Sequence, residues 1–143
     1  MSRLQAANTF WLATTRPDSR PHAMPLLAVC LEGTMYFCAG PNTQKGRNLS
    51  RDPRCVLTAA TTGLDVIIEG TAEVVTDDAT LDQAAEVYMT KYGWDAKPQD
   101  GAFMGDGAPT AGPPPLALYR LVPETAFAFG TDESLNAMKW TFG

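Results

Sequence analysis

The amino-acid sequence predicts a small, mainly β domain that closes into a barrel. The chain has 143 residues, which suits one domain with one hydrophobic core, and we expect residues 1–143 to form it. Six or seven short apolar runs are separated by Gly, Pro, Asn, Asp and Ser, and only two segments have a helical pattern. This combination favours a small closed barrel, with an open α+β sheet as the alternative.

The first forty residues predict three strands joined by tight turns. The first strand is Phe10–Thr15, the second covers residues 21–31, and the third covers residues 34–39. The connections "RPDSRP" and "EGT" consist of turn-forming residues. Pro25 lies inside the second run and has no backbone N–H. We therefore expect an edge, a bulge or an irregular stretch at that point.

Two further strands follow, Cys55–Ala60 and Leu64–Val75. The second has alternating apolar and polar positions, which is typical of a half-buried antiparallel strand. Gly70 in its middle predicts a bend. The expected inward positions are Leu64, Val66, Ile68, Gly70, Ala72 and Val74. The expected outward positions are Asp65, Glu69, Thr71 and Glu73, with Ile67 and Val75 as exceptions.

Two helices are predicted. The first covers Thr43–Arg51, with Asn42 or Thr43 as the N-cap and Pro53 after its end. The second covers Asp78–Tyr92 and places one apolar face toward the core. That face consists of Leu81, Ala84, Ala85, Tyr88 and Tyr92.

The C-terminal third predicts a long loop and two strands. Lys91–Pro115 is rich in Gly and Pro, and its second half, Gly101–Pro115, is a candidate cover for a substrate. We expect that half to be mobile because it has few residues that can anchor it. The strands "LALYRLV" and "TAFAFG" follow, and the tail ends in "NAMKWTFG".

Composition excludes several classes of function. The net charge of −5 argues against nucleic acid as a partner. No apolar run reaches the length of a membrane span and the N-terminus lacks a signal-peptide pattern, so we expect a cytoplasmic protein without membrane contact. Cys30, Cys38 and Cys55 form no CxxC motif, and His22 is the only histidine. We expect buried apolar thiols and no metal site.

Positive charge gathers in "FCAGPNTQKGRNLSRDP", Phe37–Pro53, where a predicted strand runs into a predicted helix. Lys45, Arg47 and Arg51 lie here, whereas residues 55–90 contain no Lys or Arg. The first turn of a helix has free N–H groups and attracts anions. With Thr43 as a hydroxyl donor, the segment predicts a phosphate site at the barrel rim. A solvated helix with scattered basic residues is the alternative.

Four segments taken in order identify a family resemblance: "FWLATTRPDSRPHAMPL", "MYFCAGPNTQKGRNLSRDPR", "IIEGTAEVV" and "KW" near the C-terminus. They resemble the pyridoxamine 5′-phosphate oxidase-like split-barrel proteins, and more closely the actinobacterial branch that contains enzymes dependent on the deazaflavin coenzyme F420. The resemblance implies a six-stranded antiparallel split β-barrel with two or more short helices. It also implies a homodimer with two cofactor sites at the dimer interface.

The resemblance also implies which residues bind the cofactor. The phosphate of FMN or F420 would lie against Thr43, Gln44, Lys45 and Asn48, with Arg47 as a second cation. The ring would lie along His22, Met24, Pro25 and Leu26 and against Cys38, Ala39 and Gly40. Lys139 and Trp140 would approach the site, in several family members from the partner subunit. His22 is the one candidate for a catalytic hydrogen bond or proton transfer, with plain packing as the alternative.

The cofactor and the substrate stay open at this stage. The chain ends in "KWTFG" and lacks the Arg- and His-containing segment that holds the vitamin phosphate in the oxidases proper, so we expect a different small substrate. The acidic tail of F420 needs a basic groove. Lys45, Arg47, Arg51 and Arg54 are candidates to line it, extended by Arg16 or Arg20, and this slightly favours F420 over FMN.

Three functions are compatible with the sequence. The first is an oxidoreductase in which the cofactor carries out hydride transfer and the protein binds and orients it. The second is a non-catalytic protein that binds or carries a flavin, a deazaflavin or haem, with His22 as the only histidine for the iron. The third is an interaction barrel without a small ligand.

Overall fold

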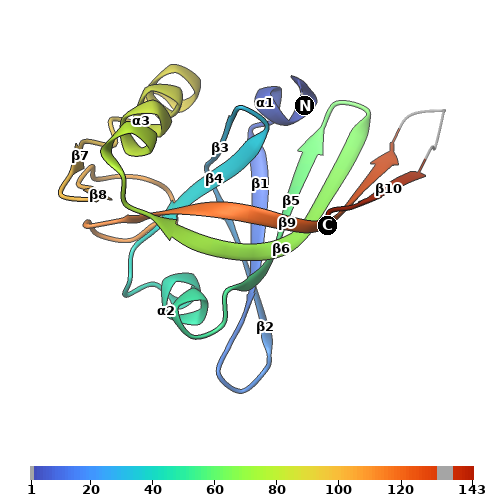
Figure 1. The fold of residues 1–143 in the computed structure, drawn as a ribbon, viewed down its shortest axis with the longest axis horizontal. Coiled ribbons are helices and arrows are strands. Elements are labelled where there is room, and N and C mark those ends of the chain that lie inside the picture. Colours follow the sequence, from blue (N-terminus) through green and yellow to red (C-terminus); the bar gives the residue numbers. More distant parts are fainter. Residues whose placement is uncertain (1, 132–136) are drawn as a thin grey trace.

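A computed structural model describes residues 2–131 and 137–143, which form one curled antiparallel sheet with three helices around it (Figure 1). The helices are α1 Ser2–Ala6, α2 Gln44–Arg51 and α3 Asp78–Tyr92. The strands are β1 Thr9–Thr15, β2 Pro21–Leu26, β3 Ala28–Leu31, β4 Thr34–Ala39, β5 Arg54–Thr61, β6 Leu64–Val75, β7 Pro98–Gln99, β8 Ala102–Phe103, β9 Ala117–Gly130 and β10 Ala137–Thr141.

The main sheet has eight strands in the order β2-β1-β5-β6-β9-β4-β3, with β10 paired to β9, and it curls into a split barrel. The barrel has six strands when β2 and β3 are counted as one and β10 is left out. The strands β2 and β3 are one stretch of chain interrupted at Leu27. The first half pairs with β1 and the second half pairs with β4, so this stretch joins the two ends of the sheet. The prediction of a six-stranded antiparallel split barrel with short helices is confirmed.

Two predicted irregularities are present. Pro25 lies on β2 opposite Trp11, just before the interruption at Leu27. The register between β6 and β9 shifts between Glu69 and Gly70, as expected for a bulge. A Cβ on Gly70 would lie 2.1 Å from the carbonyl oxygen of Val122, so only glycine allows the two backbones to approach this closely.

Some predictions of local structure were wrong. The two expected C-terminal strands are one strand, β9, because a bulge at Pro123 and Glu124 bends it without breaking its pairing with β6. Val74 is exposed and Val75 is buried, because the end of β6 packs on the layer that contains α3. The long loop contains the short hairpin β7–β8. The helix α1 and the strand β10 were not predicted.

The strand β4 packs against a different hydrophobic core on each of its two faces. The barrel interior contains Phe37, and the second core, between the barrel and α3, contains Cys38 and Tyr88. All three cysteines are buried free thiols, as predicted, and burial raises the pKa of Cys38 to about 11. Within the described ranges, no group of three or more His, Cys, Asp and Glu could hold a metal ion. Across the same ranges, no helix has the length and apolar character of a membrane span.

Candidate anion and cofactor site

The turn from β4 into α2 is built around Thr43, the N-cap of the helix. Its Oγ1 donates to the Gly40 carbonyl at 2.7 Å and accepts from the backbone N–H of Gly46 at 3.1 Å. A Cβ on Gly46 would lie 2.1 Å from the Gly40 carbonyl oxygen, so glycine allows the helix to start directly against the strand end. The first N–H groups of α2 lack partners within the helix, which favours an anion here.

Lys45 is the buried positively charged residue of this turn. Its side chain is only 2% exposed, and its Nζ donates to the carbonyl oxygen of Thr110 and to Thr110 Oγ1, the latter at 3.1 Å. Burial lowers the pKa of Lys45, and nearby Cys38 opposes this. None of the three ion pairs in the described part of the chain includes Lys45. A buried ammonium without a carboxylate is costly, and a bound anion would compensate it.

Asn48 fixes α2 to the barrel. It is fully buried, and its Nδ2 donates to Thr14 Oγ1 on β1 at 3.0 Å. Its Oδ1 accepts from Gln44 Nε2 at 2.8 Å. The amides of Asn48 and Gln44 therefore bond to protein groups in this structure, and they set the position of the helix start relative to β1.

Fewer cations are available to line the predicted basic groove than the sequence suggested, because two of the candidate arginines are in ion pairs. Arg20 pairs with Asp18, and Arg54 pairs with Asp52, which compensates both cations. Arg51 donates to the Thr15 carbonyl at 2.5 Å at the end of β1. In the described residues, the cations of this region outside ion pairs are Arg16, Lys45, Arg47 and Arg51.

His22 lies beside this group on β2, opposite Thr14. It is half-buried, and no described residue forms a hydrogen bond with its buried Nδ1. Burial lowers the pKa of His22, and the positive charges of Arg16 and Lys45 lower it further. The ring is therefore predominantly neutral at pH 7, and Nδ1 is a polar atom without a partner next to the cations.

The other predicted ring contacts are only partly available. Met24 and Pro25 are exposed, whereas Leu26 points into the barrel core. Ala39 is buried in the barrel core and Cys38 in the α3 layer, so a ligand would meet them through their backbone. The Gly40 N–H donates to the Ala111 carbonyl at 2.7 Å.

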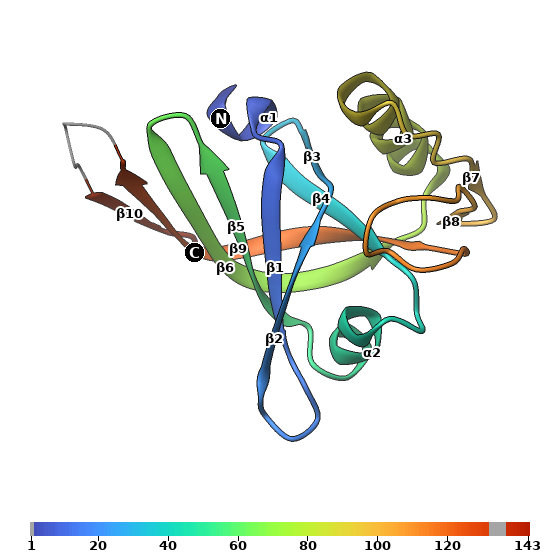
Figure 2. The ribbon, with the colours of Figure 1, turned by 180° about the vertical axis from the view of Figure 1, so that it is seen from behind.

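Lys139 and Trp140 lie far from this turn. They belong to β10, at the opposite end of the molecule from α2 in both ribbon views (Figures 1 and 2). Within one chain the structure does not bring them to Lys45.

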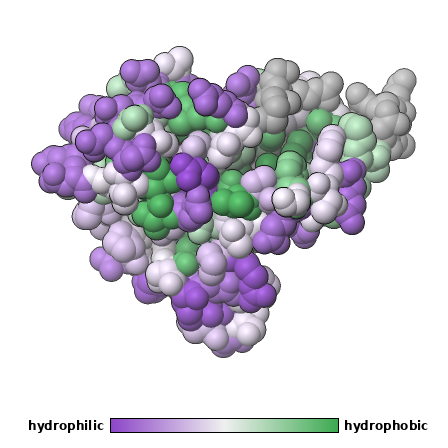
Figure 3. Space-filling view, viewed as in Figure 1, coloured by the Kyte–Doolittle hydropathy of each residue, from purple (hydrophilic) through white to green (hydrophobic). Residues whose placement is uncertain are grey.

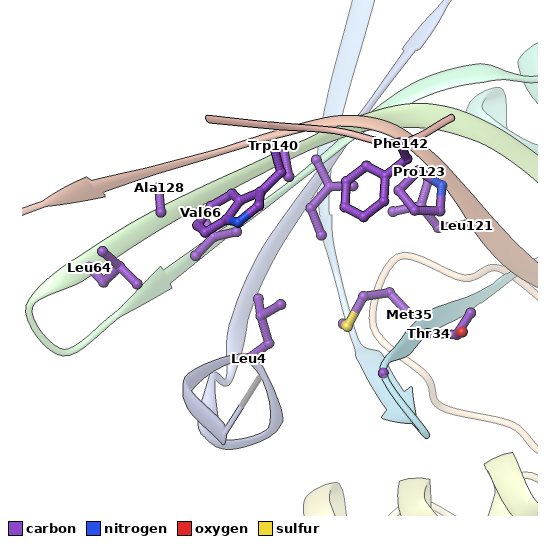
Figure 4. Close-up of a pocket in the computed structure, with 13 residues that line it drawn as sticks. Leu4, Thr34, Met35, Leu64, Val66, Leu121, Pro123, Ala128, Trp140 and Phe142 are labelled. Carbon is purple, nitrogen blue, oxygen red and sulfur yellow. The ribbon is translucent and has the colours of Figure 1, made fainter. Parts of the chain in front are cut away.

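Trp140 instead lines an apolar cavity of about 570 Å³ (Figure 4). Trp140 and Phe142 point into it from the C-terminal segment, toward Met35 and Leu4. No residue of α2 lines this cavity. Its lining residues are Leu4, Gly33, Thr34, Met35, Leu64, Val66, Ile68, Leu121, Pro123, Ala126, Ala128, Trp140 and Phe142.

The sequence did not predict the contact between Lys45 and Thr110. The Gly- and Pro-rich composition marked the loop as functional, but it gave no signal for the role of Thr110. The expectation that the loop has too few anchors was wrong, because Thr110 and Ala111 bond to the β4–α2 turn.

Comparisons with known proteins agree with the fold. The family model described as pyridoxamine 5′-phosphate oxidase matches residues 1–130, and the chain belongs to that family. No curated protein matches.

Solved structures share the fold at low sequence identity. A haem-binding protein from Mycobacterium smegmatis superposes with a TM-score of 0.73 at 20% identity, over 97% of this chain and 55% of that one. The present chain therefore spans about half the length of that protein. An F420 reductase gives 0.62 at 19% identity, over 87% of this chain and 93% of that one. A protein titled putative pyridoxamine 5′-phosphate oxidase from Listeria innocua superposes with a TM-score of 0.62 at 19% identity, over 87% of this chain and 90% of that one.

The surroundings of His22 predict a pH dependence of stability. Because the pKa of His22 lies below 6.5 in the folded protein, the unfolded chain binds this proton more readily. Stability should be highest above pH 6.5 and should fall as the pH drops through the lowered pKa. NMR titration of the imidazole should give a pKa below 6.5, and Lys45→Met should raise that pKa because one positive charge is removed. His22→Gln should reduce the dependence of the free energy of unfolding on pH in this range. A wild-type pKa at or above 6.5 would contradict this electrostatic description.

Proposed function

We propose that the protein is an oxidoreductase that uses a flavin-type cofactor, F420 or FMN, to transfer hydride to or from a small organic substrate. The observation that supports this most directly is the buried Lys45 ammonium without a carboxylate, placed at the start of α2. The same family contains proteins with redox cofactors, and an F420 reductase shares the fold.

The chain's own residues suit the binding of such a cofactor. Lys45 and the first N–H groups of α2 are the donors for the phosphate, and Thr43, whose hydroxyl donates to Gly40, fixes the turn that presents them. The half-buried imidazole of His22 is the polar group for a ring or substrate atom that lies along β2. The bound cofactor supplies the hydride chemistry, so the protein needs to orient the ring, exclude water and hold a proton at His22.

The distribution of cations favours F420 over FMN. Arg16 and Arg51 extend the positive charge beyond the phosphate position toward the β1–β2 turn, which is hydrophilic at the bottom of Figure 3. An FMN phosphate needs only the helix start, whereas the glutamate tail of F420 needs charge along an outward path.

A homodimer is part of the proposal because one cross-strand row on the outer face of the sheet is mostly apolar. Cross-strand pairs place Trp11, Thr58, Ile67 and Phe127 in one row over β1, β5, β6 and β9. Trp11 is 47% exposed. A second copy on this row would bury it and would bring another C-terminal segment near the site.

Haem carriage without catalysis is the second candidate function. A haem-binding protein shares the fold, and the half-buried His22 is the single histidine of the sequence.

The cofactor proposal predicts a charge-dependent affinity. Fluorescence titration of the protein should show binding of F420, FMN or both, and Lys45→Met should weaken it about thirtyfold or more, because a buried charged hydrogen bond is lost. Lys97→Gln removes an exposed positive charge elsewhere and should change little. Equal affinities of Lys45→Met and wild type would exclude Lys45 as the phosphate cation.

The homodimer proposal predicts a mass change on mutation. Light scattering should give a dimer for the wild type and a monomer for Trp11→Glu, because the charge replaces the most exposed apolar side chain of the row. Met89→Glu is the matched control, since Met89 is also 47% exposed but lies on α3. A monomeric wild type at micromolar concentration would contradict a shared site.

The haem alternative predicts a spectrum that depends on one side chain. Haem added to the protein should give a shifted Soret band that His22→Ala abolishes. A Soret band that is the same in His22→Ala and wild type would show that His22 is not an iron ligand.

A further inference from the structure

Three consecutive residues of the Gly- and Pro-rich loop cover the proposed phosphate site. Thr110 accepts two hydrogen bonds from Lys45 Nζ. Ala111 accepts from the Gly40 N–H at 2.7 Å. Gly112 lies so close to Thr43 that a Cβ there would be 2.7 Å from Thr43 Cγ2. The loop therefore contacts the main residues that the phosphate would use.

The oxygens of Thr110 accept hydrogen bonds from Lys45 that a phosphate at this lysine would also need. An ammonium has three N–H donors, and Thr110 accepts two of them. Because Lys45 is only 2% exposed, no anion can reach its Nζ while Thr110 is in place. Binding of the cofactor phosphate to Lys45 therefore requires the loop to move.

The backbone of Thr110 is held in an unfavourable conformation. Its φ is +62°, which is a genuine outlier for a β-branched residue. Its Oγ1 also donates to the Pro25 carbonyl at 2.5 Å, so the residue connects Lys45 to β2. Such strain persists only where contacts maintain it, and loss of the Lys45 contact would release it.

The two ends of the loop are fixed while the middle can move. Phe103 and Leu116 exchange two backbone hydrogen bonds, at 2.9 and 2.8 Å, and hold the base. Between them Gly107 and Gly112 have φ of +83° and +79°, conformations that glycine adopts without strain. A movement of this segment would break the bonds of Thr110 and Ala111 to the β4–α2 turn and withdraw Ala111 from the second core, but it would leave the barrel strands paired.

We propose that residues 108–115 form a lid that competes with the cofactor phosphate for Lys45. The inference rests on the proposed function, because it assumes an anion at Lys45. The lid is closed when Thr110 accepts from Lys45, and it opens when the phosphate replaces Thr110. Opening also releases Pro25 on β2, along which the ring would lie. Occupation of the phosphate site and access to the ring site are thereby coupled.

The test is the affinity of Thr110→Val for F420 and FMN. This variant keeps the β-branched shape and removes the hydroxyl that bonds to Lys45 and Pro25, so the closed lid is weaker and the cofactor should bind about tenfold more tightly. Thr110→Ser keeps the hydroxyl and should bind like the wild type. Thr90→Val, at an exposed site on α3, is the matched control and should have no effect.

Hydrogen exchange of the loop supplies a readout that does not depend on activity. Peptides covering residues 104–116 should exchange faster in Lys45→Met than in the wild type, and faster in the wild type when F420 or FMN is bound.

The outcomes separate the lid from the cofactor site. If Lys45→Met no longer binds the cofactor and Thr110→Val has the affinity of the wild type, the phosphate site at Lys45 is supported and the lid is refuted. Weaker cofactor binding by Thr110→Val would show that Thr110 contacts the cofactor, and it would also refute competition between Thr110 and the phosphate for Lys45. If no variant binds either cofactor, both proposals fail. Binding by Thr110→Val alone would support a lid that is closed in the wild type.

Discussion

The buried ammonium of Lys45 is the constraint on which the rest of the site depends. A lysine that is 2% exposed and outside the ion pairs of the described residues would be costly unless its surroundings supplied acceptors. In this chain Thr110 supplies them. A site that satisfies a cation with neutral oxygens, rather than with a carboxylate, keeps its positive charge available to an anion.

The barrel fixes the position of this cation. Both faces of β4 are buried, Phe37 inside the barrel and Cys38 under α3, so the end of the strand has little freedom. Asn48 then ties α2 to Thr14 on β1. The donors at the start of α2 are therefore held by a rigid scaffold and need little reorganisation of their own when an anion binds.

The sequence predicted what depends on local pattern and missed what depends on distant contacts. Alternation and a central Gly70 predicted β6 and its bulge, and N-cap chemistry predicted α2 from Thr43. The single strand β9 was missed because Pro123 and Glu124 resemble a turn in isolation, whereas pairing with β6 keeps them in the sheet. The resemblance named Lys45 as a cofactor contact, and the structure buries Lys45 at the start of α2, whereas its contact with a cofactor stays a prediction. Thr110 is 65 residues from Lys45, and nothing in its neighbourhood along the chain marks it.

The most direct measurement is the pKa of Lys45 by NMR, using labelled lysine, with and without saturating F420 or FMN. Burial without a carboxylate lowers this pKa below 10.5 in the free protein. If the cofactor phosphate binds at Lys45, its negative charge should raise the pKa of Lys45 on saturation, and the signal should be absent in Lys45→Met. A cofactor that binds and leaves the Lys45 pKa unchanged would show that the anion lies elsewhere and would contradict the role given to the α2 start.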